Sequence, residues 1–323
     1  MRAAVRDRFG SPAVVELREI EKPVPADNDV LVRIRAASLN MADWYDVAGR
    51  PYVGRVQVGM RGPKSNRLGV DYAGTVEAVG TDVTQFSPGD DVFGGRNGAF
   101  AEYICAREGR AIVPKPANVT FEEAAAVPIA AITALQGLRD QGQLQPGQKV
   151  LINGASGGVG TFAVQVAKAL GGEVTAVVST ANVDIARSLG ADHVIDYTRE
   201  DFTRIDGRYD LMLDVAGNRS WSACKRVLRE RATLVIVGGP KANRLLGPLG
   251  GVLKKWVAGR FSRRKVVFFI AKLNKADMLV LEELVETGQV KPAIDRRYEL
   301  SEIAAALEYM GEGHARGKIV ITV

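Results

Sequence analysis

The chain has 323 residues, of which 46% are hydrophobic and 25% charged, and its formal net charge at pH 7 is +6. This length predicts about two domains with a sizeable core, and the composition excludes disordered and fibrous proteins. The charged start MRAAVRDRFG does not resemble a secretory signal, and the longest apolar stretch, residues 124–135, is too short to span a bilayer. Because only Cys105 and Cys224 are present, no disulfide framework is expected, and we expect a cytoplasmic protein.

The N-terminal third of the chain reads as short β-strands. Alternating apolar and polar residues, separated by Pro, Gly and Asp, predict strands at 3–9, 14–20, 29–39, 71–80, 92–95 and 99–106. These elements predict a partly closed β domain.

The pattern changes after Phe121. A helix is predicted over 121–140, with Thr120 as N-cap and Glu123 three residues later. Strands then alternate with helices: strands at 149–154, 173–179, 193–197, 209–217, 233–239 and 266–270, and helices at 161–171, 184–190 and 220–232. This alternation predicts parallel βαβ units with right-handed crossovers. The tail predicts two helices, 277–288 and 299–313, and a last strand, 318–323, that returns to the first domain.

The positive charge is concentrated in two segments that contain no acidic residue. Residues 241–265 hold eight Lys and Arg, and residues 50–67 hold five. Three interpretations stay open: solvated loops, an electropositive rim over an anionic cofactor, and a weak membrane-surface contact through 241–265. No nucleic acid is expected, because no recognised binding motif accompanies the charge.

The stretch LINGASGGVG, residues 151–160, places glycines between a predicted strand and a predicted helix. In a dinucleotide-binding turn, one glycine makes the tight turn, one lets the backbone approach the pyrophosphate, and one packs helix against strand. Ala155, Gly157 and Gly160 occupy these positions here, so the first is Ala and not Gly. The residues expected to line the pyrophosphate are Ala155, Ser156, Gly157, Gly158, Val159 and Gly160.

The end of the next strand indicates which dinucleotide binds. NAD-binding domains usually end this strand with Asp or Glu, whereas this chain has Ser179, Thr180, Ala181 and Asn182. Without a carboxylate to repel a ribose 2′-phosphate, NADPH is favoured over NADH. Tyr197 and Arg199, after the third strand, are further candidates to reach that phosphate. Alternatively, Ser179 and Thr180 only terminate the strand.

Several motifs together resemble a zinc-free medium-chain dehydrogenase/reductase of the quinone oxidoreductase type. They are SLNMAD, LGVDYAGTVEAVG, PGDDVF, GAFAEY, AAAVPIAAITALQGL, GQKVLINGASGGVG, LGADHVIDY and HARGKIVITV, and they cover nearly the whole chain. The resemblance implies an α/β protein in which a Rossmann domain with a doubly wound parallel sheet, 122–274, is inserted into a GroES-like, partly closed β-barrel substrate domain, 1–121 and 275–323. It also implies a cleft where NADPH delivers hydride, and a homodimer.

The resemblance allows a test for zinc at each ligand position. Zinc-dependent relatives carry Cys in the segment that corresponds to Asn40 and Gly-His-Glu where this chain has Gly69-Val70-Asp71. Neither Asn40 nor Val70 is a usual zinc ligand. His193 and His314 are interpreted as structural residues, and no metal is expected.

Without zinc as a Lewis acid, the favoured substrates are those that accept hydride unaided: quinones and carbon–carbon double bonds conjugated to a carbonyl. By resemblance, Asn40 lies near the nicotinamide ribose and the substrate oxygen. Tyr45 and Tyr52 are candidate proton donors or substrate orienters, or else aromatic residues of the cleft wall. Asp43 is interpreted as a structural hydrogen-bond acceptor.

Further cofactor contacts follow from the same resemblance. They are Thr133 near the nicotinamide ribose, Val237 and Gly238 at a strand end, Phe269 and Ile270 near the carboxamide, and Lys318 near the phosphates. Two alternative functions stay open: an NADPH-binding structural or sensor protein with little turnover, and an alcohol dehydrogenase-like activity.

Overall fold

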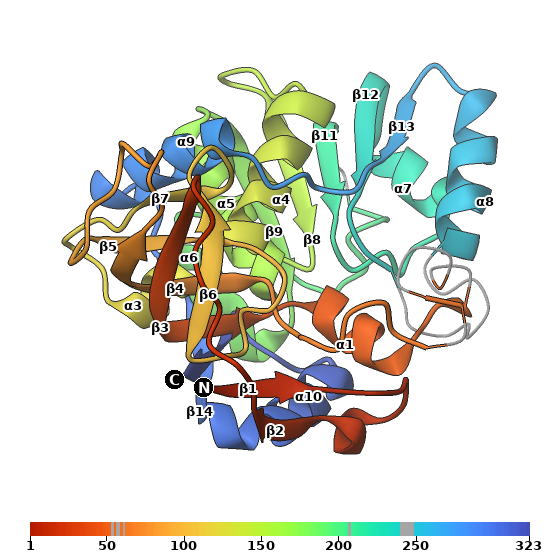
Figure 1. The fold of residues 1–323 in the computed structure, drawn as a ribbon. Coiled ribbons are helices and arrows are strands. Elements are labelled where there is room, and N and C mark those ends of the chain that lie inside the picture. The colour runs from red at the N-terminus through yellow and green to blue at the C-terminus, as the bar shows by residue number, and fades with distance from the viewer. Residues whose placement is uncertain (53–54, 56–58, 61, 206–207, 240–248) are drawn as a thin grey trace. The chain divides into compact units, whose positions relative to one another are not determined.

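The chain forms two compact units in the computed structural model, which describes all residues except 53–54, 56–58, 61, 206–207 and 240–248 (Figure 1). The first unit combines Met1–Ile132 with Leu273–Val323, and the second is Thr133–Lys272. The start of the basic segment, 241–248, therefore lies outside the described residues. Among the described helices, none has the length and apolar character that a membrane crossing requires.

The first unit is built on a mixed sheet in which the C-terminal strand joins strands of the N-terminal region. Its order is β14-β15-β3-β4-β5-β7, with β6 paired to the first half of β3. The strands are β3 (Asp29–Leu39), β4 (Asp71–Val79), β5 (Asp91–Gly95), β6 (Tyr103–Arg107), β7 (Ile112–Pro114), β14 (Ile294–Glu299) and β15 (Lys318–Thr322). β1 (Arg2–Val5) and β2 (Glu16–Glu19) form a separate antiparallel pair. β15 pairs antiparallel with β3, which confirms that the tail returns to the first domain.

Among the described residues, five α-helices belong wholly or partly to the first unit. They are α1 (Met41–Ala48), α3 (Phe121–Ala125), α4 (Pro128–Leu135), α9 (Lys275–Glu286) and α10 (Ile303–Glu312). The single helix predicted over 121–140 is divided, because Pro128 lacks an N–H and starts a new helix. The Thr120 cap is confirmed: the Glu123 N–H donates to Thr120 Oγ1, and the Thr120 N–H donates to the Glu123 carboxylate.

The second unit is a six-stranded parallel sheet in the order β10-β9-β8-β11-β12-β13. Its strands are β8 (Lys149–Asn153), β9 (Glu173–Val178), β10 (His193–Asp196), β11 (Tyr209–Asp214), β12 (Leu228–Ile236) and β13 (Lys265–Phe268). The helices α5 (Gly158–Ala169), α6 (Val183–Ser188), α7 (Trp221–Val227) and α8 (Leu249–Arg260) complete it. Because β9 and β11 flank β8, the winding direction reverses at β8, and ligands of such sheets bind at the carboxyl ends of these strands.

Two elements of the second unit differ from the sequence prediction. The helix predicted to reach residue 232 ends at Val227, because Leu228 pairs with Tyr209 of β11 and starts β12. α8 was not predicted, because its glycines lower helix propensity. Gly259 explains its docking: a Cβ there would lie 2.3 Å from Val266 Cγ2, so only glycine allows this approach to β13.

Candidate functional site

The glycine turn joins the carboxyl end of β8 to the start of α5. Gly154 has φ +88°, a conformation that favours glycine, and a Cβ on Gly160 would lie 2.1 Å from the Gly154 carbonyl oxygen. Gly157 is different, because a Cβ there would have one heavy atom within 4 Å, at 3.8 Å. Gly154 and Gly160 therefore serve the turn itself, whereas the absence of a side chain at Gly157 leaves space for a ligand.

The N-terminus of α5 faces this space. Gly157 is the N-cap in an extended conformation. The N–H groups of Gly158, Val159 and Gly160 lie in the first helical turn, so no helical carbonyl four residues before them accepts their hydrogen bonds. These groups and the helix dipole favour an anion. The Asn182 Nδ2 donates to Ser179 Oγ at 2.9 Å and to Ser156 Oγ at 3.3 Å, which ties the turn to the end of β9.

Asn182 also leaves one buried atom unsatisfied. Its Oδ1 has no hydrogen-bond partner among the residues that the structure describes, although Asn182 is only 7% exposed. Buried polar atoms are normally paired, so this oxygen is a candidate acceptor for a ligand hydroxyl. The donors of α5, the space at Gly157 and this acceptor together fit a phosphorylated, hydroxyl-bearing ligand such as a dinucleotide.

The parallel sheet brings the other predicted contacts of the second unit to one edge. Ser179 and Thr180 follow β9, Tyr197 follows β10, Val237 and Gly238 follow β12, and Phe269 and Ile270 follow β13. Because all six strands run in the same direction, these positions lie at the same edge as the glycine turn. Thr133 is half-buried on α4, which precedes the first strand of this sheet.

A carboxylate near the end of β9 was missed by the sequence argument for NADPH. Asp196 Oδ2 accepts a hydrogen bond from Thr180 Oγ1 at 2.6 Å, and the Arg199 guanidinium lies 3.4 Å from the same oxygen. The hydrogen bond from Thr180 lowers the pKa of Asp196, so the carboxylate is ionised at neutral pH. None of residues 179–182 is acidic, as the sequence argument states, but β10 supplies a carboxylate beside Thr180 that this argument did not include.

A buried ion pair at the end of β11 was also missed. Lys255 Nζ of α8 donates to Asp214 Oδ2 at 2.6 Å, and Asp214 is fully buried. Asp214 Oδ1 accepts from Asn153 Nδ2 at 2.8 Å and from the Gly217 N–H at 2.9 Å. The pair thus fixes α8 to the ends of β8 and β11. The sequence of the basic segment does not indicate that the Lys255 side chain faces the interior.

The first unit contains a second buried polar cluster around Asp71. Asp71 Oδ2 accepts from Asn40 Nδ2 at 2.8 Å and from Ser38 Oγ at 3.2 Å, and the Ile129 N–H donates to Asp71 Oδ1 at 3.1 Å. Lys318 Nζ donates to Asn40 Oδ1 at 2.6 Å and lies 3.5 Å from Asp71 Oδ2. Burial raises the pKa of Asp71 and lowers the pKa of Lys318, while their mutual attraction opposes both shifts.

The expected phosphate contact of Lys318 needs correction. The Lys318 side chain is 2% exposed, and its ammonium also donates to the Leu39 carbonyl at 2.9 Å. All three acceptors belong to the interior of the first unit, so the side chain serves this cluster and is not free to bind phosphate. The sequence placed Lys318 at the start of the last strand but did not indicate which way its side chain points.

Asn40 and Asp43 join this cluster to α1. The Asn40 N–H donates to Asp43 Oδ2 at 2.7 Å, so Asp43 is a hydrogen-bond acceptor at the helix start, as interpreted. Burial raises the pKa of Asp43 to about 7. The Asn40 amide uses its oxygen for Lys318 and one N–H for Asp71, which leaves one N–H for another acceptor.

The two candidate tyrosines lie in different environments. Tyr45, on α1, is half-buried, and its ring meets that of Trp44 edge-on at 5.3 Å. Burial raises its pKa, so the phenol stays protonated at neutral pH. Tyr52 is 40% exposed, and the Arg55 guanidinium lies 4.7 Å from its ring centre.

Potential metal ligands are scattered in the described part of the chain. There, no three residues of the types His, Cys, Asp and Glu gather closely enough to bind a metal ion. Of the positions compared above with zinc ligands, Asn40 and Asp71 are hydrogen-bonded to each other, and the Lys318 ammonium lies beside both. His193 lies 3.1 Å from Glu173 Oε1 in a surface network.

The fold and the site define a two-domain protein with a Rossmann dinucleotide-binding domain. Residues 26–117 match the family described as alcohol dehydrogenase GroES-like domain, and residues 189–321 match the family described as zinc-binding dehydrogenase.

Individual relatives match over nearly the whole chain. It is 33% identical to the chloroplastic quinone oxidoreductase QR1 of Triphysaria versicolor, over 99% of this chain and 98% of the relative. It is 30% identical to the chloroplastic NADPH-dependent alkenal/one oxidoreductase of Arabidopsis thaliana, over 99% and 79%. The solved quinone oxidoreductase of Coxiella burnetii superimposes with a TM-score of 0.86 at 30% identity, over 100% and 99%. The chain therefore belongs to the medium-chain dehydrogenase/reductase superfamily, among its quinone oxidoreductase-like proteins.

Proposed function

We propose that this protein is an NADPH-dependent oxidoreductase that transfers hydride to a quinone or to an α,β-unsaturated carbonyl compound without zinc. The observation that carries the proposal is the glycine turn, where Gly157 leaves space for a ligand at the N-terminus of α5. The relatives named as quinone and alkenal/one oxidoreductases support an NAD(P)H-dependent redox activity.

The second unit would hold the cofactor. The N–H groups of Gly158, Val159 and Gly160 would bind the pyrophosphate, and Asn182 Oδ1 would accept from a cofactor hydroxyl. When bound, the nicotinamide supplies the hydride. NADPH is preferred over NADH because β9 ends in hydroxyl and amide side chains, and Arg199 offsets part of the Asp196 charge. The further cofactor contacts that we propose at the same edge of the sheet are Val237, Gly238, Phe269 and Ile270.

Asn40 would stabilise charge on the substrate. Its remaining amide N–H is proposed to donate to the carbonyl oxygen that becomes negative as hydride arrives. Lys318 on the amide oxygen polarises the group, so this N–H is a stronger donor than that of an isolated Asn.

The donor set of the Asp71 cluster supports a reaction without zinc. Zinc requires thiolate, imidazole or carboxylate ligands, and Asn40 and Val70 supply none of these. The Lys318 ammonium, 2.6 Å from Asn40 Oδ1, would repel a divalent cation. We therefore propose that the substrates are compounds that accept a hydride and a proton without the help of a Lewis acid.

The proton donor is distinguished by comparing Tyr45→Phe with Tyr52→Phe. If one phenol donates the proton that follows hydride, its replacement lowers kcat for an enone by about 100-fold with little change in KM. A tyrosine that only packs against the substrate changes KM instead. Steady-state kinetics on one enone at several pH values separates the two, and equal, small effects of both variants would assign the proton to solvent.

The function is tested by oxidation of NADPH and NADH by the purified protein with an ortho-quinone and a conjugated enone in parallel, with product identification. We expect faster turnover with NADPH and reduction of at least one acceptor. Tight NADPH binding without turnover would contradict the reductase proposal and favour the sensor alternative. Alcohol oxidation by a protein that contains stoichiometric zinc would favour the alcohol dehydrogenase alternative.

We further propose a homodimer formed through β13 and α8. Within the described sheet, β13 has a neighbour on one side only, so its other side presents unpaired backbone groups. A pocket of about 480 Å³ beside it is lined by Val252, Leu253, Trp256 and Val266–Phe268. A second copy would supply both a strand for the edge and apolar cover for the pocket.

A further inference from the structure

The ion pair between Lys255 and Asp214 lies at the same edge of the parallel sheet as the glycine turn. Asp214 is the last residue of β11, and it pairs in register with Asn153, the last residue of β8, directly before the turn. Lys255 Nζ donates to Asp214 Oδ2 at 2.6 Å and to the Gly217 carbonyl at 3.3 Å. α8 therefore contributes a side chain to the interior of the proposed cofactor edge.

The Asp214 carboxylate organises residues 215–218, which we call the β11 loop. Its Oδ1 accepts from the Gly217 N–H at 2.9 Å and from Asn153 Nδ2 at 2.8 Å. Asn153 Nδ2 also donates to Asn218 Oδ1 at 3.1 Å, and the Asn153 carbonyl accepts from the first two N–H groups of the loop at 3.0 and 3.1 Å. Each residue of the β11 loop is thus held by Asn153 or by the ion pair.

The β11 loop packs directly against the glycine turn. A Cβ on Gly154 would lie 3.1 Å from the Ala216 nitrogen, and a Cβ on Gly217 would lie 2.5 Å from the Gly238 carbonyl oxygen. The loop therefore lies between the glycine turn and the end of β12. Because the segments approach each other this closely, a displacement of the loop also displaces the backbone of the glycine turn.

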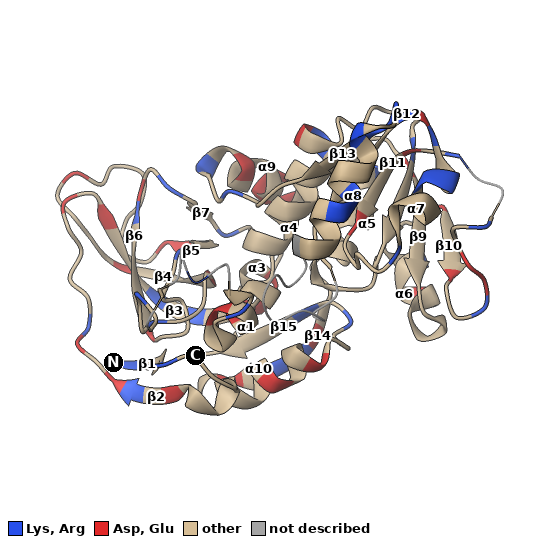
Figure 2. Cartoon of the chain, turned by 90° about the vertical axis from the view of Figure 1, so that its right-hand side faces the viewer, with Lys and Arg blue, Asp and Glu red and all other residues tan. Residues whose placement is uncertain are grey.

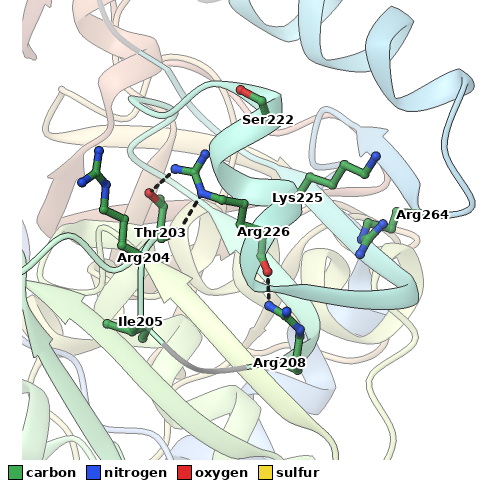
Figure 3. Close-up of a pocket in the computed structure, with 8 residues that line it drawn as sticks. All are labelled: Thr203, Arg204, Ile205, Arg208, Ser222, Lys225, Arg226 and Arg264. Carbon is green, nitrogen blue, oxygen red and sulfur yellow. Dashed lines mark hydrogen bonds between the residues drawn. The ribbon is translucent and has the colours of Figure 1, made fainter.

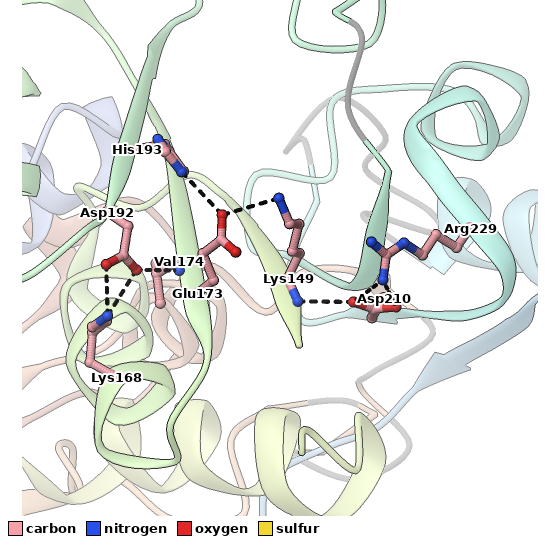
Figure 4. A network of polar contacts seen from close by, with 8 residues as sticks. All are labelled: Lys149, Lys168, Glu173, Val174, Asp192, His193, Asp210 and Arg229. Carbon is pink, nitrogen blue, oxygen red and sulfur yellow. Dashed lines mark hydrogen bonds and ion pairs between the residues drawn. The ribbon is translucent and has the colours of Figure 1, made fainter. Parts of the chain in front are cut away.

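The amino edge of the same strands offers a comparison (Figure 4). There, the Lys149 N–H at the start of β8 donates to Asp210 Oδ2 at 2.9 Å, and Arg229 pairs with Asp210 at 2.7 Å. The Arg229 side chain is 47% exposed, whereas the side chains of Lys255 and Asp214 are 7% and 0% exposed. An exposed ion pair loses little hydration, whereas a buried pair has to offset the lost hydration of two charges.

Stability alone does not account for a buried ion pair at this position. Such a pair can often be replaced by apolar side chains of similar volume without loss of stability. The helix that follows the β11 loop has anchors of its own at the amino edge (Figure 3). Arg226 of α7 donates to the Thr203 carbonyl and to Thr203 Oγ1, each at 3.1 Å, and Arg208 donates to the Arg226 carbonyl. The feature that the ion pair fixes is therefore the β11 loop.

We infer that Lys255 is a positioning residue of the proposed cofactor site: through Asp214 it holds the β11 loop in the place that keeps the glycine turn open for the cofactor phosphates. The inference rests on the proposed function, because it assigns a role at the same dinucleotide site. The Lys255 ammonium acts through Asp214 and the Gly217 carbonyl and not by contact with the cofactor. One cation of the basic segment 241–265 thus serves the anion site indirectly.

The test compares K255M with R229M, a control that removes a cation paired with β11 at the opposite edge. Each protein is titrated with NADPH by fluorescence, at a temperature well below its unfolding. We expect the dissociation constant for NADPH to rise at least tenfold in K255M and less than twofold in R229M. With a saturating acceptor, KM for NADPH should rise in K255M while kcat falls less than threefold, because Lys255 takes no part in the chemical step.

Two further measurements separate positioning from stability. The Gly217 N–H should exchange with solvent faster in K255M, whereas exchange of the Lys149 N–H at the amino edge should not change. K255M/D214L removes the carboxylate that K255M leaves unpaired, so it should be more stable than K255M. It also removes the acceptor of the Gly217 N–H, so it should bind NADPH no more tightly than K255M.

Three results would overturn the inference. They are unchanged NADPH affinity in folded K255M, equal weakening in K255M and R229M, and recovery of affinity together with stability in K255M/D214L. The last result would show that the ion pair acts on stability only. Failure of the proposed function is recognised separately: the parent protein would then bind no NADPH, and the inference would fall with it.

Discussion

Gly157 and Gly160 lie three residues apart in one turn but have opposite reasons to be glycine. A Cβ at Gly160 would collide with the Gly154 carbonyl, whereas a Cβ at Gly157 would enter open space at the N-terminus of α5. The backbone of Gly157, with φ −82°, also accepts alanine. The two positions therefore separate binding from folding.

Gly157→Ala is expected to fold normally and to bind NADPH about 10- to 100-fold more weakly, a free-energy loss of about 1.4 to 2.8 kcal/mol, because the methyl group occupies the ligand space. Its stability should change by less than about 1 kcal/mol, as for other Gly→Ala changes in a compatible conformation. Fluorescence titration and denaturant unfolding measure both quantities.

Two variants serve as controls for this prediction. Gly160→Ala should lower stability itself, and Gly109→Ala, where a Cβ meets nothing within 4 Å, should leave both quantities unchanged. Normal NADPH affinity in a folded Gly157→Ala protein would contradict the assignment of the ligand space.

Asp43 makes stability depend on pH in an unusual direction. Its pKa of about 7 in the folded protein lies above the ordinary value of 3.8, so the folded state binds the proton more tightly. Its contribution is therefore largest below pH 4 and is lost as the pH rises to about 7.

Asp43→Asn keeps the oxygen that accepts from the Asn40 N–H but does not titrate. Relative to the parent protein, the variant should gain about 2 kcal/mol between pH 5 and pH 7, at roughly 1.4 kcal/mol per unit of pKa difference. Urea unfolding at the two pH values measures this change. A constant difference between the two proteins would show that Asp43 ionises normally.

At the scale of elements, α8 is attached to the sheet by the Lys255 side chain, whose buried position cannot be predicted from the composition of the helix. Lys254 and Lys255 are neighbours in the same basic segment, yet Lys254 is exposed and Lys255 is 6% exposed against Asp214. Within the described part of the chain, α8 is docked by the Lys255–Asp214 ion pair together with the packing of Val252 and Gly259.

Lys255→Met should destabilise the protein by about 3 to 5 kcal/mol, because it leaves the buried Asp214 carboxylate without its cation. Lys254→Met, the adjacent exposed position, should change stability by less than about 0.5 kcal/mol. Denaturant unfolding compares the two variants. If both have the same stability, the Lys255–Asp214 pair does not hold α8 in solution.

The elements also show where sequence patterns are reliable. The capping box at Thr120 and the strands of the parallel sheet were predicted, because capping and apolar runs act within a few residues. β12 was predicted to start at residue 233 but starts at Leu228, where pairing with β11 overrides the helix propensity of the RER segment. β14 was not predicted, because IDRRYE has little apolar content and becomes a strand only by pairing with β15.

At the scale of the whole molecule, the proposed dimer can be tested by a substitution at the β13 edge of the parallel sheet. Val267→Lys places a charge on β13 beside the apolar pocket of α8, a change that commonly prevents edge-to-edge pairing. Light scattering should give twice the chain mass for the parent protein and the single mass for Val267→Lys.

Other outcomes of that experiment are also informative. A parent protein that is monomeric and binds anionic vesicles through this face would contradict the dimer and favour the membrane contact considered for the basic segment. Figure 2 shows the Lys and Arg residues of α8 that such a contact would use.

The sequence by itself determined the features that depend on neighbouring residues. The alternation of strands and helices, the glycine turn from Gly154 to Gly160, and the ends of the parallel strands follow from local patterns, because backbone geometry acts over a few residues. The family resemblance rests on these same segments.

Only the tertiary structure decided which distant groups meet. It directed Lys318 into the Asp71 cluster, placed Asp196 beside Thr180, and paired Lys255 with Asp214. These contacts depend on strand order and register, which bring together residues far apart in the chain, and on side-chain direction. The charge of a residue is readable in the sequence, but its partner is set by the fold.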